Sequence, residues 1–148
     1  MSGHIRPIAL ALIWRGEELL VFEGYDPADG GVFYRPLGGG IRFGERSDEA
    51  LRRELREELH VELVDVRYLR TLENLFVHNG APGHEIVQLY EATLADPSYY
   101  EPERFEVHED GGLVLTARWM ALDEFQGDSP PLVPEGLLPL LTCEGGTS

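Results

Sequence analysis

The segment from Ser47 to Leu59 constrains the fold more than any other part of the chain, because its apolar residues repeat with a helical period. At about 100° per residue, Leu51, Leu55 and Leu59 fall on one stripe, which predicts an amphipathic helix with that stripe against a core. The opposite side of the helix carries mixed charges and is expected to face water. A helix of this kind must pack against a second layer, so a layered domain is expected.

Three glutamates, Glu54, Glu57 and Glu58, flank the leucine stripe and lie within about 100° of one another. Carboxylates three and four residues apart repel one another by roughly 0.2–0.5 kcal/mol per pair in water. A divalent cation would remove this cost, and Mg²⁺ is held by one or two carboxylates together with waters and substrate phosphates. The alternative is an ordinary solvated face in an acidic protein.

A glycine-rich stretch from Gly38 to Glu45 leads directly into this helix. Glycine lets the backbone approach a ligand closely, and the N–H groups at a helix N-terminus can meet phosphate oxygens. We therefore expect the stretch and the helix to form one site.

The charge balance limits the partners of the chain. The 148 residues carry 27 acidic and 12 basic side chains, a net charge of -15, and every basic residue is arginine. Clustered basic residues drive binding to nucleic-acid polymers and anionic membranes, so neither is expected as a partner. No apolar run approaches the ~20 residues of a membrane span, and the N-terminus has no signal pattern. A cytoplasmic protein with a single domain over residues 1–148 is expected.

Strand patterns dominate the rest of the chain and predict an α/β (α+β) sandwich. Residues 5–14 and 19–22 are expected to form a first hairpin, and residues 61–77 and 85–94 a second one. Residues 36–40 are expected to break regular structure, and residues 96–112 to form a loop. Further elements are expected as strands at 32–35 and 113–120 and as short helices at 122–125 and 137–141.

The stretch from Gly39 to Val61 resembles the Nudix box of the MutT-like Nudix hydrolases. Glu45 follows Gly39 after five residues, and Arg53-Glu54-Leu55, Glu57-Glu58 and Val61 follow in the spacing of that box. The departure is His60, where the family has glycine. Glycine suits the left-handed end of a helix, and histidine tolerates that conformation at some cost, so slight strain and no loss of chemistry are expected there.

The resemblance implies an α/β/α sandwich with a mixed sheet between helices, and metal-dependent hydrolysis of the pyrophosphate bond in a nucleoside diphosphate linked to another group. Mg²⁺ or Mn²⁺ is the implied cofactor, with Glu54, Glu57, Glu58 and the Gly38 carbonyl as ligands. The implied catalytic residues are these glutamates and Arg53. Glu45 and Gly39 are expected to support the loop and the helix.

Residues outside the box give weaker predictions about the substrate. Arg35 and Tyr34 precede the glycines and are candidates for phosphate contact and base stacking, although packing is an equal alternative. The general base is either a box glutamate or an acid of the later loop, where Glu101, Glu103 and Glu106 are candidates, with Glu103 also a substrate-binding candidate. Tyr99 and Tyr100 are candidates for a stacking pair.

Three functions remain open at this point: an active hydrolase, a catalytically silent Nudix-like domain that binds a nucleotide as a sensor, and an acidic cation-binding protein. The substrate is open among nucleoside triphosphates, nucleotide sugars and similar diphosphates. A homodimer is also compatible with the resemblance.

Overall fold

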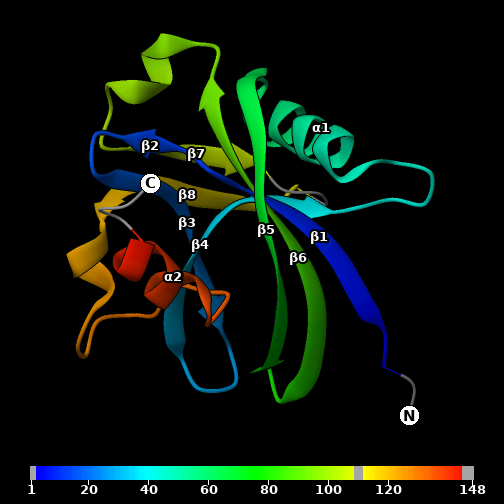
Figure 1. Ribbon diagram of the computed structural model, residues 1–148. Coiled ribbons are helices and arrows are strands. Elements are labelled where there is room, and N and C mark those ends of the chain that lie inside the picture. Colours follow the sequence, from blue (N-terminus) through cyan, green and yellow to red (C-terminus); the bar gives the residue numbers. More distant parts are fainter. Residues whose placement is uncertain (1–2, 109–111, 145–148) are drawn as a thin grey trace.

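The computed structural model describes residues 3–108 and 112–144, apart from the side chains of the last two residues (Figure 1). Its strands are β1 (Ile5–Leu12), β2 (Trp14–Arg15), β3 (Glu18–Asp26), β4 (Gly31–Gly40), β5 (Leu63–His78), β6 (Ala81–Leu94), β7 (Arg104–His108) and β8 (Val114–Ala121). Its helices are α1 (Ser47–Leu59) and α2 (Leu137–Glu144), with the 3₁₀ helices η1 (Pro97–Tyr100) and η3 (Leu122–Phe125).

The strands of the described chain form a mixed sheet in the order β5-β6-β1-β4-β3-β8-β7, with β2 paired to β3 outside this path. The inner strand β1 runs antiparallel to β4 and parallel to β6. The expected hairpin of residues 5–14 with 19–22 is therefore wrong for most of its length. Only the short β2 pairs with β3, because β1 is hydrogen-bonded on both sides by distant strands.

The two helices lie on opposite sides of the sheet, α1 at the upper right and α2 at the lower left of Figure 1. Leucines of α1 pack with Ile13, Leu20 and Trp119 in one buried cluster. Leu137 of α2 packs with Leu10 and Val87 in a second cluster. Apolar residues thus cover both faces of the sheet, as the alternation of side chains along strands requires. This arrangement confirms the predicted sandwich of helices around a mixed sheet.

Helix α1 has the predicted bounds. Leu51 and Leu55 are fully buried and Leu59 is 2% exposed, so the leucine stripe faces the core as predicted. The Glu49 carboxylate accepts a hydrogen bond from the Arg46 backbone N–H (2.8 Å), which closes the first turn. His60 ends the helix in the left-handed conformation, with φ 58°, as the box position predicts.

His60→Gly is expected to stabilise the protein by about 0.5–1 kcal/mol, because glycine adopts the left-handed conformation without the Cβ clash. The side chain of His60 is exposed, so its loss removes little packing. Denaturant unfolding of wild type, His60→Gly and His60→Ala measures the effect. His60→Ala keeps the Cβ and is the control; an equal gain in both variants would contradict this explanation.

Two stretches predicted as irregular contain strand. β4 continues through Pro36–Gly40, because Gly38, Gly39 and Gly40 pair in register with Leu10, Ala9 and Ile8 of β1. Within residues 96–112, the described part forms η1 and β7, whereas residues 109–111 lie outside the described residues. No helix of the described chain is long and apolar enough to span a membrane.

Candidate active site

The end of β4 and the acidic side of α1 meet at a pocket of about 210 Å³. Box residues line it together with residues from β1, β4, β7 and the start of the β8 region, namely Gly38, Gly39, Glu54, Glu57, Glu58, Arg6, Arg35, His108 and Leu113. The structure thus brings the three glutamates of α1 and the glycines before it to one place, as expected from the sequence.

Two glycines make this approach of helix and strand possible. A Cβ at Gly39 would lie 2.6 Å from Oε2 of Glu54, inside the contact distance of a real side chain. Gly38 has φ 145°, and a Cβ there would collide with the Ala9 carbonyl of β1. A side chain at position 38 would displace the backbone of the paired strand, so glycine is required there, whereas a side chain at position 39 would push the Glu54 carboxylate out of its place.

Arg53 ties the carboxylates of the site to the loop before α1. Its Nε donates to Glu45 (2.7 Å), and its Nη2 donates to Glu45 (3.0 Å) and to the Gly40 carbonyl (2.9 Å). Its Nη1 donates to Glu54 and Glu57, both at 3.2 Å. The bidentate pair with Glu45 fixes the plane of the guanidinium. Arg53 therefore braces the loop and neutralises part of the acidic cluster at the same time.

This pairing changes the ionisation of both partners. Hydrogen bonds from Arg53, and then from the Arg42 backbone N–H, lower the pKa of Glu45 to about 2 from its ordinary 4.5. In return, the hydrogen bond to Glu45 raises the pKa of Arg53, and Glu54 contributes in the same direction. Both groups are therefore charged at every pH at which the protein is expected to work.

In the Glu45→Gln variant, the free energy of unfolding is expected to fall less steeply below pH 4.5 than in the wild type. Because the pKa of Glu45 is lower in the folded state than its ordinary 4.5, its pairing stabilises the protein fully above pH 4.5. This stabilisation is lost as the pH falls toward about 2. Urea unfolding at stepped pH should therefore give a shallower decline in the variant. Glu17→Gln, at an exposed turn, is the control, and a slope unchanged in Glu45→Gln would refute the expectation.

The three glutamates differ in burial. Glu58 is 3% exposed, the Glu54 side chain 14% and the Glu57 side chain 39%. Among the described residues, no group of three or more His, Cys, Asp or Glu side chains is arranged to hold a metal ion. The donor set nevertheless suits a hard cation, because carboxylates and the Gly38 carbonyl are all oxygen ligands. Arg53 already contacts Glu54 and Glu57, so a cation there would compete with it.

Two arginines line the same pocket from other strands. Arg35 of β4 donates to the Gly38 carbonyl (3.3 Å) and lies over the Phe22 ring, 4.7 Å from its centroid. Arg6 of β1 lies beside Gly40 and 3.9 Å from Glu85. Arg35 was a sequence candidate, whereas Arg6 was missed. Only the pairing of β1 with β4 brings Arg6 to the site, and no local pattern in the sequence signals that pairing.

The structure does not bring Tyr34 or Glu103 to this pocket. Tyr34 alternates with Arg35 along β4 and faces the other side, where it is 6% exposed and packs edge-on against Phe125. Burial, and then the nearby Glu23 carboxylate, raise the pKa of Tyr34. Glu103 is 74% exposed and pairs with Arg15 (2.8 Å).

The other residues of the predicted later loop are also placed elsewhere. Glu101 and Glu106 are exposed and do not line the pocket, whereas His108, at the end of β7, does. Tyr100 is half-buried and stacks on the buried Trp119, with ring centroids 5.2 Å apart, so it does not form an exposed stacking pair with Tyr99. His108 was missed because β7 was expected to be part of a loop, and Leu113 was expected only as the start of a strand.

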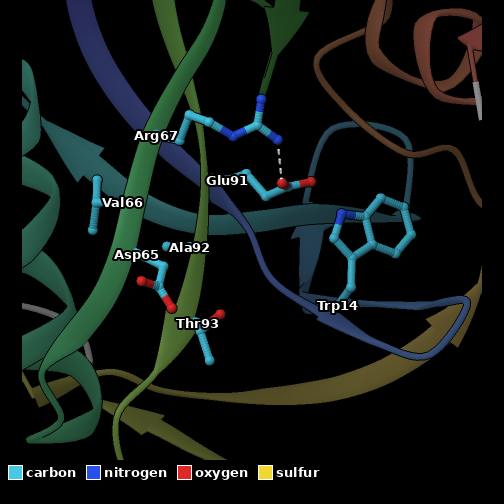
Figure 2. Close-up of a pocket in the computed structure, with 7 residues that line it drawn as sticks. All are labelled: Trp14, Asp65, Val66, Arg67, Glu91, Ala92 and Thr93. Atoms are coloured by element: carbon cyan, nitrogen blue, oxygen red, sulfur yellow. Dashed lines mark hydrogen bonds and ion pairs between the residues drawn. The ribbon is translucent and has the colours of Figure 1, made fainter. Parts of the chain in front are cut away.

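A larger pocket of about 690 Å³ lies between β2, the first residues of β5 and the last residues of β6 (Figure 2). Arg67 of β5 and its register partner Glu91 of β6 form an ion pair beside it, and Trp14 of β2 also lines it. Its lining shares no residue with the acidic pocket. The chemistry-bearing residues of the box therefore belong to the smaller pocket alone.

Comparison with known proteins agrees with this geometry. The family model described as the NUDIX domain matches residues 4–140, so the chain belongs to the NUDIX domain family. This confirms the family predicted from the box, that of the Nudix hydrolases.

Three solved structures illustrate the likeness. The solution structure of the E. coli ORF135 protein is 23% identical, with 97% of this chain and 92% of that chain covered and a TM-score of 0.61. A MutT NUDIX hydrolase from Burkholderia pseudomallei is 22% identical over 91% and 95%, with a TM-score of 0.56. A protein described as an ADP compounds hydrolase is 18% identical over 99% and 77%, with a TM-score of 0.61. At these identities the likeness establishes the fold.

Proposed function

We propose that this enzyme hydrolyses the pyrophosphate bond of a small nucleotide in which a nucleoside diphosphate is linked to another group, with Mg²⁺ or Mn²⁺ as cofactor. The observation that carries the proposal is the composition of the 210 Å³ pocket, which is lined by three carboxylates of α1 and by two arginines, one from β1 and one from β4. Carboxylates bind divalent cations and arginines bind phosphate oxygens. The pocket therefore offers groups for both parts of a metal-bound diphosphate.

Glu54, Glu57 and Glu58, with the Gly38 carbonyl, are the proposed cation ligands. A bound divalent cation would supply charge neutralisation on the phosphate oxygens and lower the pKa of an attacking water. Arg53 is the proposed catalytic partner that holds Glu54 and Glu57 in place, and Glu45 and Gly39 support it. Among the described residues of the pocket, these three glutamates are the carboxylates that can accept a proton from water.

Arg35 and Arg6 are the proposed contacts for the phosphates. The chain has no lysine, so phosphate binding depends on arginines, on backbone N–H groups and on the cation. Arg35 can present its planar guanidinium in a fixed orientation, because the Phe22 ring and the Gly38 carbonyl hold it from two sides. A homodimer and a cytoplasmic location stay predictions.

A screen of nucleotides tests the proposal. Nucleoside triphosphates, including oxidised ones, nucleotide sugars and ADP-linked compounds are incubated with the protein and Mg²⁺ or Mn²⁺, and products are resolved by chromatography. The expected result is metal-dependent release of a nucleoside monophosphate with at least one class. ADP-linked compounds are included because one solved relative is described as acting on them.

The alternative is a catalytically silent domain that binds a nucleotide as a sensor. The contact of Arg53 with both Glu54 and Glu57 favours it, because these carboxylates are already neutralised in part. Calorimetric binding of a nucleotide without any turnover in the screen would support this alternative. Binding of Mg²⁺ with no response to any nucleotide would instead indicate a cation-binding protein.

A further inference from the structure

Helix α1 is held at both ends by a tyrosine hydroxyl from another element. At its C-terminal end, the Tyr99 hydroxyl of η1 donates to the carbonyl of Leu59, the last residue of the helix, at 2.8 Å. At its N-terminal end, the side-chain hydroxyl of Ser47, the first residue, is hydrogen-bonded to the Tyr90 hydroxyl of β6. The two contacts therefore lie at opposite ends of the helix, and neither tyrosine lines the acidic pocket.

The contact at Leu59 satisfies a group that a helix leaves without an internal partner, since the last four carbonyls lack one. Tyr99 is itself fixed in place. Its ring packs edge-on against Phe105, with centroids 5.2 Å apart, and its carbonyl accepts a hydrogen bond from Nε1 of the buried Trp119 (3.3 Å). The Tyr99 hydroxyl is therefore a donor anchored to the core, and it limits movement of the helix end.

The contact at Ser47 is anchored in the same way. Tyr90 is 7% exposed and belongs to the buried cluster that also contains the leucines of α1. Its ring packs edge-on against Tyr68 of β5, with centroids 5.7 Å apart. The leucine stripe resists movement of α1 away from the sheet, whereas the two hydroxyls resist movement along the helix axis.

Position along that axis matters for the acidic pocket because helix and strand approach so closely there. The Glu54 carboxylate occupies the space that a Cβ of Gly39 would need. A small shift of α1 would therefore change how Glu54 lies relative to Gly38 and Gly39. We propose that Tyr99 and Tyr90 are positioning residues, which hold α1 in the register that aligns its glutamates with the glycine backbone for cation binding. This rests on the proposed function of the pocket.

Tyr99→Phe tests the C-terminal contact, because it removes only the hydroxyl. Tyr100→Phe is the matched control: its hydroxyl accepts from the Leu94 N–H (2.8 Å) in the same segment and does not contact α1. Two quantities are measured in the protein without nucleotide, namely the dissociation constant for Mn²⁺ by calorimetry and amide hydrogen exchange along α1. Thermal midpoints are recorded so that variants of similar stability are compared.

Tyr99→Phe is expected to bind Mn²⁺ roughly three- to tenfold more weakly, the range set by loss of one hydrogen bond. The amide hydrogens in the last turn of α1 should also exchange faster in Tyr99→Phe, whereas Tyr100→Phe should change neither quantity. Exchange along α1 that is the same in the two variants would overturn the proposal. If the wild type binds no Mn²⁺, the proposed function fails, and the exchange comparison alone decides the positioning role.

A double-mutant cycle tests the N-terminal contact. Ser47→Ala and Tyr90→Phe each remove one partner, so the double variant should exchange along α1 no faster than the more affected single variant. Effects that simply add would show that the two hydroxyls act independently and would overturn this half of the proposal.

Discussion

Glu57→Gln is expected to lower kcat by at least about a hundredfold while the protein stays folded, a scale typical of single groups that stabilise charge in a transition state. Glu57 is the most exposed of the three pocket glutamates, with 39% of its side chain accessible, so its replacement disturbs packing least. The amide keeps the shape of the side chain and removes the negative charge that a cation needs. Turnover of the best substrate from the nucleotide screen measures the effect.

Glu62→Gln is the matched control for this variant. Glu62 also pairs with an arginine of α1, since it accepts from Arg56 at 2.8 Å, but it lies just past the C-terminal end of the helix and does not line the pocket. It should therefore keep wild-type turnover. Circular dichroism and a thermal midpoint establish that both variants are folded. Near-wild-type turnover in folded Glu57→Gln would sink the assignment of Glu57.

Gly38→Ala is expected to destabilise the protein by about 2–5 kcal/mol, because backbone strain and a steric clash act together. Gly38 has φ 145°, and an added Cβ would meet the Ala9 carbonyl and lie 2.9 Å from Cα of Leu10. Both neighbours are backbone atoms of the inner strand β1, which cannot rotate away as a side chain could. The thermal midpoint should fall by roughly 5–15 °C.

Gly44→Ala measures the effect of backbone strain without a steric clash, and so it is the control for Gly38→Ala. Gly44 also has a positive φ, 90°, but a Cβ there would meet nothing within 4 Å. A loss of only about 1–2 kcal/mol is therefore expected, from the backbone conformation alone. Equal losses in the two alanine variants would mean that the close approach of Gly38 to β1 has no energetic consequence.

The part of the site that lies on α1 was predictable from the sequence for a physical reason. Helical periodicity is local, so Leu51, Leu55 and Leu59 identify the buried side and thereby the side on which the glutamates project. The left-handed conformation of His60 was likewise predictable, because the end of a helix has few backbone solutions. The bounds Ser47–Leu59 were confirmed without correction.

Long-range strand pairing explains what could not be predicted. Arg6 reaches the pocket only because β1 pairs with β4, and nothing near Arg6 in the sequence specifies this partner. Gly38, Gly39 and Gly40 were expected to end regular structure, yet they pair with β1. An added Cβ would meet the β1 backbone at Gly38, Glu54 of α1 at Gly39 and Arg6 of β1 at Gly40, so this part of the strand is built of glycine. The short strand β7 was missed because its residues are mostly charged and only Phe105 and Val107 turn toward the core.

The parallel pairing of β1 with β6 has a consequence for how the molecule folds. Ile8 is aligned with Val87, so during synthesis β1 finds this neighbour only after all the residues between the two strands have been made. Contacts so distant in sequence slow folding, because a large loop must close before they form. Until then the apolar run Ile8–Ile13, which is fully buried in the folded protein, stays accessible to chaperones and to other unfinished chains. Slow refolding and concentration-dependent aggregation from denaturant are therefore expected for this protein.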